Sequence, residues 1–250
     1  MGKPRGTFII VDGIDGSGKG TVVDAYAAWA QEKSLRVFDV RAFAKEHQRL
    51  PEPAEWKGSD VLVSAEPTHC GIGRVIREEI IKDNGRHYTG RTAAEAFALD
   101  RLVLHVQVIL PALAAGLLVL QERGVSSSIA YQPLQKLITL AQLLKLEGNR
   151  FALQHRPDLL LVPVCPIPVA LQRLSKRIKK DHAIFEKRAF LKKLDTRYRS
   201  PWFAKIFRHR GSVVGFLDTN DTLAETQKEA VGYINDFLKQ KSPALLLHTR

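Results

Sequence analysis

A glycine-rich segment, residues 13–21 (GIDGSGKGT), constrains the fold of this chain more than any other part of the sequence. It fits the pattern G-x-x-x-x-G-K, and it lies between a short apolar run at residues 8–11 and a stretch with helical spacing. Glycines there let backbone N–H groups surround phosphate oxygens, and the start of the helix and Lys19 add positive charge. A glycine turn that only connects a strand to a helix would not require a lysine directly after the last glycine of the pattern. The segment therefore predicts a nucleotide-binding loop between a buried strand and a helix.

The rest of the chain alternates short apolar runs with helical stretches. Such alternation is typical of a parallel sheet covered by helices on both faces. The runs lie at residues 8–11, 35–40, 61–63, 117–120, 159–164 and 213–217. We predict an α/β fold of the P-loop type, with three α/β/α layers around a parallel five-stranded sheet and a lid. Residues 1–241 should form one domain, followed by a C-terminal tail at 242–250.

Composition excludes several other classes of protein. Hydrophobic residues make up 45% of the 250 residues and charged residues 26%, which is ordinary for a globular chain. The longest apolar run, near residues 108–120, contains Pro111 and Gly116 and is too short to span a bilayer. Two cysteines give neither a disulfide framework nor metal-ligand spacing. We expect a soluble cytoplasmic protein with no membrane partner.

The charge of the chain is strongly basic and unevenly distributed. Lys and Arg number 38 against 26 Asp and Glu, a formal net charge of +12. Residues 173–199 alone hold eleven Lys or Arg and three acids. Such a surplus favours anionic partners. Aromatic residues are sparse in this segment, which disfavours a nucleic-acid surface. Two alternatives stay open for it: a solvated helix face, or a segment that covers bound phosphates.

Several stretches together resemble the thymidylate kinases. Residues 8–21, 66–77, 96–101, 113–132 and 156–164 occur in the order and approximate spacing of that family. The resemblance implies transfer of a phosphoryl group from ATP to a deoxynucleoside monophosphate, dTMP to dTDP in the first place, with Mg²⁺ as cofactor. It also implies a homodimer formed through helices beside the sheet. An Asn-Lys-x-Asp guanine signature does not occur, which disfavours a GTPase.

On the donor side, the resemblance assigns ATP to the glycine-rich segment and catalysis to nearby charges. Lys19, Glu122, Arg123 and a cation of the lid at 173–199, represented by Arg177, would stabilise phosphoryl transfer. Thr21 and Glu122 would hold Mg²⁺. The expected ATP-binding residues are Gly13, Asp15, Gly16, Ser17, Gly18, Lys19, Gly20 and Thr21.

On the acceptor side, the resemblance assigns the base, the sugar and the monophosphate to separate residues. Phe97 would stack on the base beside Arg101, Asp15 and Tyr131 would contact the sugar, and Arg77 and Arg123 would hold the phosphate. From the residues alone, Asp15 could equally cap a turn, Phe97 and Tyr131 could be core, and Arg101 could be a solvated charge. The expected substrate-binding residues are Asp15, Glu66, Arg77, Phe97, Arg101, Arg123, Ser128 and Tyr131.

The acceptor side departs from the family pattern at four places. Ala65 stands where the family usually has an arginine that contacts the acceptor phosphate. Glu122 replaces an aspartate, Gly124 replaces an aromatic residue, and residues 42–59 form an extra excursion. These departures keep two alternatives open: a kinase for another deoxynucleoside monophosphate, and a nucleotide-binding protein with weakened turnover.

Overall fold

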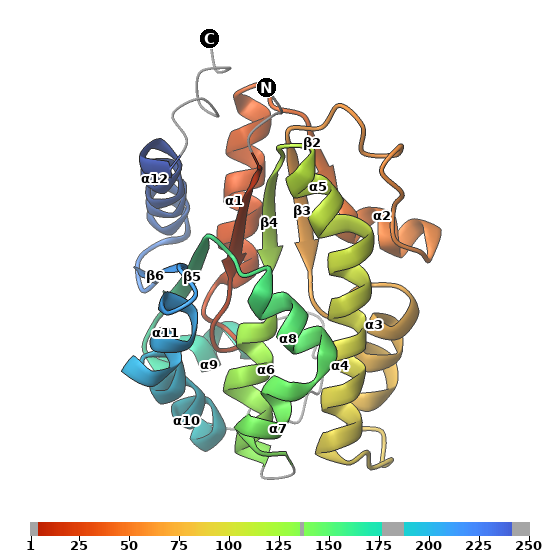
Figure 1. The fold of residues 1–250 in the computed structure, drawn as a ribbon. Coiled ribbons are helices and arrows are strands. Elements are labelled where there is room, and N and C mark those ends of the chain that lie inside the picture. Colours follow the sequence, from red (N-terminus) through yellow and green to blue (C-terminus); the bar gives the residue numbers. More distant parts are fainter. Residues whose placement is uncertain (1–4, 136–137, 177–187, 242–250) are drawn as a thin grey trace.

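A parallel sheet runs through the middle of the protein, in the order β2-β3-β4-β1-β5-β6 (Figure 1). The computed structural model describes residues 5–135, 138–176 and 188–241. Within these residues the sheet has six strands, so the expected number of five is wrong. All six apolar runs seen in the sequence pair into it. The strands are β1 (Thr7–Val11), β2 (Val37–Asp39), β3 (Val61–Ala65), β4 (Leu118–Glu122), β5 (Leu159–Val164) and β6 (Val213–Asp218).

The central strands are buried on both faces, as their apolar composition requires. Every residue of β1 and β3 is buried, and neighbouring side chains alternate between the two faces. The edge strand β2 has only three residues, because Asp39 already accepts hydrogen bonds from the backbone N–H groups of Arg41 and Ala42. Asp39 thereby caps the next helix and ends the strand.

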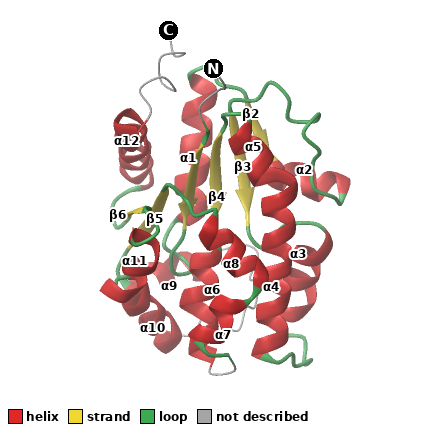
Figure 2. Cartoon of the chain, in the orientation of Figure 1, coloured by secondary structure: helices red, strands yellow, loops and turns green. Residues whose placement is uncertain are grey.

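Helices cover both faces of the sheet, which gives the predicted three layers (Figure 2). The apolar residues of α1 and α12 pack on one face with Ile9 and Val11, and most other helices lie over the face of Phe8 and Ile10. The helices are α1 (Lys19–Glu32), α2 (Val40–His47), α3 (Gly71–Val75), α4 (Gly90–Leu104), α5 (Leu110–Ala114), α6 (Val125–Tyr131), α7 (Leu140–Lys145), α8 (Glu147–Gln154), α9 (Ile167–Ser175), α10 (Arg188–Tyr198), α11 (Pro201–Arg208) and α12 (Leu223–Lys241), with π-helical turns at Ile76–Ile80 and His105–Ile109 and a 3-10 turn at Gln132–Gln135.

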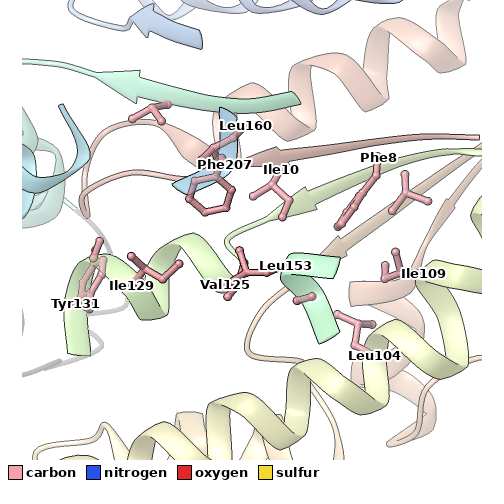
Figure 3. Packing of buried hydrophobic residues seen from close by; sticks show 14 of the residues in the cluster. Phe8, Ile10, Leu104, Ile109, Val125, Ile129, Tyr131, Leu153, Leu160 and Phe207 are labelled. Atoms are coloured by element: carbon pink, nitrogen blue, oxygen red, sulfur yellow. The ribbon is translucent and has the colours of Figure 1, made fainter. Parts of the chain in front are cut away.

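The larger core lies between the sheet and the helices around α4, α6 and α8 (Figure 3). Figure 3 shows Phe8 and Ile10 of β1 facing Leu104, Val125 and Leu153 from three helices. Both cores pack on the same sheet. A single domain over residues 1–241 stays a prediction.

One long helical run, Gly90–Ala114, combines α4, a π-helical turn and α5. Among the described residues it is the run whose length and composition would allow it to cross a membrane, and half of it is buried inside the protein. Gly148 of α8 approaches it so closely that an added Cβ would lie 1.8 Å from the carbonyl oxygen of Ala98. The run therefore serves as a core helix that other helices pack against.

The apolar spacing of residues 127–147 in the sequence predicts one continuous helix, and this prediction is wrong. Helix α6 ends at Tyr131 and continues into a 3-10 turn that contains Pro133. Helix α7 begins afresh at Leu140, where Thr139 and Gln142 form a reciprocal capping box. Proline cannot donate to a helix ladder, so the break follows from the local sequence.

Candidate active site

Three strands end at the same level and bring the predicted site residues together. In the sheet register, Glu122 of β4 lies beside Val11 of β1 and Ala65 of β3. The pairing continues past the strands, because the N–H of Arg123 donates to Val11 and that of Glu66 donates to Glu122. The loops that follow these strands therefore open at one edge of the sheet, which is the usual place for a ligand in a parallel α/β fold.

The glycine-rich loop forms a tight turn that ends at the start of α1. Gly16 and Gly18 have positive φ angles of 82° and 89°, and Gly18 is the N-cap residue of α1. An added Cβ at Gly16 would lie 2.4 Å from the carbonyl oxygen of Ala170, so this position admits no side chain. The loop thus has the backbone that a phosphate cradle requires.

Lys19 lies across the inside of this loop. Its Nζ donates to the carbonyl of Ile14 at 2.8 Å and lies 3.6 Å from Asp15 Oδ1. The side chain is 4% exposed, and burial, assisted by the positive charge of Arg123, lowers the pKa of Lys19 to about 8. Its ammonium group is therefore poorly solvated and gains most from an incoming anion.

Asp15, Arg123 and Tyr131 form a compact cluster next to Lys19. Arg123 makes an ion pair with Asp15, and Tyr131 donates its hydroxyl to Asp15 Oδ2 at 3.2 Å. The Arg123 guanidinium lies 5.7 Å from the centre of the Tyr131 ring. Burial alone would raise the pKa of Asp15, but the charges of Arg123 and Lys19 outweigh it and hold that pKa well below its usual range. The carboxylate is therefore ionised at neutral pH.

The backbone at Arg123 is strained in order to aim this side chain. Its φ is 65°, in the left-handed region that residues with a Cβ rarely adopt. Such a conformation costs about 1–3 kcal/mol and is often found at functional sites. At the next residue, Gly124, an added Cβ would lie 2.7 Å from Ile10 Cδ1, so the Ile10 side chain would have to shift to admit the aromatic residue usual in the family.

Glu122 faces the first turn of α1. A Cβ added at Gly20 would lie 3.5 Å from its Oε2, and Glu122 is partly exposed. In the described residues, no group of three or more His, Cys, Asp or Glu side chains is arranged to hold a metal ion. Mg²⁺ in phosphoryl-transfer sites takes one or two carboxylates, waters and substrate phosphates, and Glu122 fits that pattern. Thr21 lies in the same first turn of α1.

Arg101 lies inside the protein, in a network of buried polar groups. Its Nε and Nη2 bind the Glu66 carboxylate at 2.9 and 2.7 Å, and its Nη2 also donates to the carbonyl of Gly124 and to Ser128 Oγ. It also donates to Asn149 of α8. The side chain is 1% exposed, so the alternative of a solvated charge is wrong. Contact of Arg101 with a base stays a prediction.

Glu66 is the acidic centre of this network. It accepts from Gln121 Nε2 at 3.0 Å as well as from Arg101. Burial raises the pKa of Glu66 to about 7, although Arg101 opposes the shift. Through Arg101 and Gln121, Glu66 and Ser128 thus link the end of β3 to β4, α4 and α6 in the protein interior.

The remaining expected residues lie around the rim. Phe97 is partly buried on α4, one turn before Arg101. Arg77 donates to the carbonyls of Pro67 and Thr68 at 3.0 and 3.1 Å and so holds the loop after β3. Arg177 lies outside the described residues. Arg173, at the end of α9, donates to the carbonyl of Thr219, whose hydroxyl donates to Ser17 of the glycine-rich loop at 2.9 Å.

Two polar residues of the site were missed in the sequence analysis. Gln132 is 4% exposed, and neither atom of its amide has a hydrogen-bond partner among the described residues. Asp12 is fully buried and accepts four hydrogen bonds. Gln132 could have been predicted from its position directly after Tyr131. Asp12 could not, because a single acidic residue after a strand does not by itself indicate a functional site.

Comparison with known proteins identifies the family. The sequence model of the thymidylate kinase family matches residues 45–228. This chain belongs to the thymidylate kinase family. It is 34% identical over 176 residues to a probable thymidylate kinase of Pyrococcus abyssi, covering 69% of this chain and 72% of that protein. It is 27% identical over 237 residues to a thymidylate kinase of Caldicellulosiruptor saccharolyticus, covering 95% of this chain and all of that protein.

Membership of the family settles the class of the protein. Thymidylate kinases are nucleoside monophosphate kinases, a class of transferases that bind nucleotides and act in nucleotide biosynthesis. The matched range begins after residue 21, so the glycine-rich loop lies outside it. The geometry of that loop is therefore an observation independent of the family match, and it fits a nucleotide-binding protein.

The buried Glu66–Arg101 pair gives a prediction for stability. Arg101→Met leaves Glu66 buried without its cation, which destabilises a protein by about 3–5 kcal/mol when the acid is charged. Loss of the cation raises the pKa of Glu66 above its present value of about 7. A carboxyl with a raised folded-state pKa contributes stability at low pH and loses it as pH rises. The variant should therefore lose more unfolding free energy at pH 8 than at pH 5.

Urea unfolding of the wild type and the variant at both pH values measures this difference. Arg91→Met is the matched control, since Arg91 pairs with Glu95 at an exposed position of the same helix. That variant should show no pH-dependent loss. An equal loss for Arg101→Met at pH 5 and pH 8 would contradict the assignment of a charged pair.

Proposed function

We propose that this protein transfers the γ-phosphoryl group of ATP to a deoxynucleoside monophosphate, and that dTMP is its preferred acceptor. The observation that carries the proposal is the cluster of Asp15, Arg123 and Tyr131, which is continuous with Lys19 of the glycine-rich loop. An acceptor held by this cluster has its phosphate close to the donor's terminal phosphate. Phosphoryl transfer needs mainly such positioning and positive charge.

On the donor side, the backbone N–H groups of residues 13–21 hold the ATP phosphates and Lys19 neutralises their charge. Glu122 and Thr21 are the residues that would hold Mg²⁺. Mg²⁺ supplies charge neutralisation for the transferred phosphoryl group when it is bound. Arg173 lies beside the loop, and Arg177 as the lid cation stays a prediction.

On the acceptor side, we assign the sugar and phosphate to the Asp15 cluster. Asp15 is ionised and accepts the 3′-hydroxyl group, the Tyr131 ring lies against C2′ and disfavours a ribose hydroxyl, and Arg123 binds the phosphate. Phe97 stacks on the base. The amide of Gln132, which has no partner among the residues that the structure describes, offers a donor and an acceptor, and these suit a carbonyl and the N3–H of thymine.

Lys19 provides the test of this function. Lys19→Ala should lower kcat/KM for ATP-dependent ADP release in the presence of dTMP by at least about 100-fold, because a positive group facing developing charge is lost. The pKa of Lys19 is about 8, so kcat/KM of the wild type for ATP should fall above pH 8 as the free protein loses this charge. Bound phosphate stabilises the ammonium form, so kcat should change less over the same range.

Lys19→Arg is the matched control for this pH profile. Arginine stays charged at every pH used, so this variant should show a lower but level kcat/KM above pH 8. A wild-type kcat/KM that stays level to pH 9.5, or full activity of Lys19→Ala, would contradict the role given to Lys19.

Arg41 is our candidate to replace the arginine that the family usually has at position 65. Asp39 of β2 pairs with Val63 of β3, and Arg41 lies in the first turn of α2 directly after this strand end. Asp39 and Asp24 orient the guanidinium through Nε and Nη2. Neither N–H of its Nη1 has a partner within the part of the chain that the structure describes, and we propose that they bind the acceptor phosphate.

Arg41→Ala should raise KM for dTMP by about tenfold, which corresponds to one hydrogen bond between charged groups, and leave KM for ATP unchanged. Arg74→Ala is the matched control, because Arg74 is half-exposed and points to Gln48 and Glu78. Adding Ala65→Arg to Arg41→Ala should restore a low KM. Equal KM values for the Arg41 and Arg74 variants would refute the assignment.

We propose a homodimer that forms through the outer face of α4. Leu99 and Val103 of α4 and Val106 of the following turn are 50%, 39% and 54% exposed, and an exposed apolar stripe of this kind is typical of an interface. Within the apolar stretch at residues 134–144, the alternative candidate for the interface, Ile138 and Leu143 face the core instead.

A charge introduced into this stripe should give monomers. Val106→Glu should halve the mass measured by light scattering after gel filtration, because an interface core excludes unpaired charges. Leu223→Glu is the control, at a 63% exposed apolar residue of α12. A monomeric wild type, or a dimeric Val106→Glu variant, would contradict this interface.

A further inference from the structure

The buried carboxylate of Asp12 joins three separate segments of the protein. Its Oδ1 accepts from the N–H of Gly13 at 2.8 Å, from Ser127 Oγ at 2.8 Å and from the hydroxyl of Tyr198 at 3.0 Å. Its Oδ2 accepts from Ser126 Oγ. These donors belong to the glycine-rich loop, the first turn of α6 and the last residue of α10. Asp12 is 0% exposed, and its hydrogen bonds to Gly13, Ser126 and Tyr198 are buried, whereas the one to Ser127 is partly buried.

Tyr198 is the contact that comes from the most distant part of the sequence. Its side chain is 1% exposed, and its ring packs edge-on against Tyr131 and Phe203 at 6.4 and 5.1 Å between ring centres. Burial and the charge of Asp12 raise the pKa of Tyr198 well above its usual value. The hydroxyl therefore remains protonated and donates to Asp12 at every pH at which the protein would be assayed.

A second contact fixes α10 to α6 beside this hydrogen bond. Arg197 donates from Nη2 to the carbonyl of Ile129 at 3.0 Å. Phe190, near the start of the same helix, lies 6.1 Å from the Tyr131 ring. Helix α10 thus touches α6 along its length, and Tyr131, which belongs to the acceptor cluster, lies between the aromatic rings of α10.

We propose that Tyr198 is a positioning residue that, through Asp12, holds the glycine-rich loop and α6 in one arrangement, so that nucleotide donor and acceptor bind cooperatively. The inference rests on the proposed function. Asp12 orients Gly13, the first N–H of the donor loop, and it orients the turn that carries Ser128 and Tyr131. One carboxylate bonds to both the donor loop and α6. A ligand that orders one of these segments therefore reduces the conformational entropy that is lost when a second ligand binds at the other.

The Tyr198→Phe variant removes this hydroxyl and keeps the ring and its packing. We expect kcat for dTMP phosphorylation to fall by about 10- to 100-fold, the range for a lost hydrogen bond to a charged group and a misplaced reacting pair. We also expect the factor by which a non-hydrolysable ATP analogue tightens dTMP binding, measured by calorimetry, to fall at least about fivefold.

Tyr26→Phe is the matched control. Tyr26 is also 1% exposed, and its hydroxyl bonds to Asn235 at 3.3 Å in the core on the other face of the sheet. Each variant loses one tyrosine hydrogen bond, buried at Tyr198 and partly buried at Tyr26, so a merely structural role would lower the unfolding midpoints and leave kcat and the binding factor of both unchanged. The positioning role predicts that only Tyr198→Phe changes these two quantities.

A second variant keeps the test decisive if Tyr198→Phe does not fold. Ser127→Ala removes another donor to the same oxygen from the α6 side, and it should lower the binding factor in the same direction. If the wild type neither binds nor phosphorylates dTMP, the proposed function fails. If the wild type is active but Tyr198→Phe, or Ser127→Ala in its place, behaves as Tyr26→Phe does, the positioning role alone is overturned.

Discussion

The parallel register of β1, β3 and β4 is the constraint on which the rest of the site depends. It places Val11, Ala65 and Glu122 side by side, so the loops that follow these strands begin at one edge. Each loop then contributes what its own sequence carries: the glycine-rich turn after β1, Glu66 after β3 and Arg123 after β4. A shift of one residue in this pairing would turn these side chains to the other face of the sheet.

Charge inside the protein is the second determinant. Lys19 and Asp15 are buried, Arg123 beside them is 24% exposed, and Glu66 and Arg101 are buried further inside the protein. Buried charges are stable only when they are paired and hydrogen-bonded, and these groups are. Lys19, Asp15 and Arg123 lie next to the glycine-rich loop and to Tyr131, so they can replace their contacts with one another by contacts with a bound nucleotide. The Glu66–Arg101 pair bonds to α6 and α8 and acts as a rigid support.

Much of this was predictable from the sequence, because the relevant signals are local. The spacing of Gly13, Gly18 and Lys19 indicated the loop, and apolar runs indicated each strand. The expected number of five strands was wrong although the sequence shows six apolar runs, including residues 35–40 for the short strand β2. The break after Tyr131 had a visible signal in Pro133, which the apolar spacing of the following residues obscured.

The burial of individual side chains, and the contacts between residues far apart in the sequence, could not be predicted in this way. The spacing of Phe97 and Arg101 shows that they share a helix face, but it does not show that Arg101 would be buried against Glu66 and Asn149. Asp12 looks like any acid in a loop until the fold brings Ser126 and Tyr198 to it from positions more than 100 residues away. Such contacts depend on the tertiary structure, and no periodicity in the sequence carries them.

We propose that one site joins an ATP-binding loop to a pocket that selects dTMP. The most direct test is the rate of ADP release with saturating ATP and Mg²⁺ and with dTMP, dUMP, dCMP, dAMP, dGMP or no acceptor. The account predicts that kcat/KM is highest with dTMP and that little ADP is released without an acceptor. A higher kcat/KM with another monophosphate would contradict the assignment of the base pocket, and ATP binding without turnover on any acceptor would contradict the kinase itself.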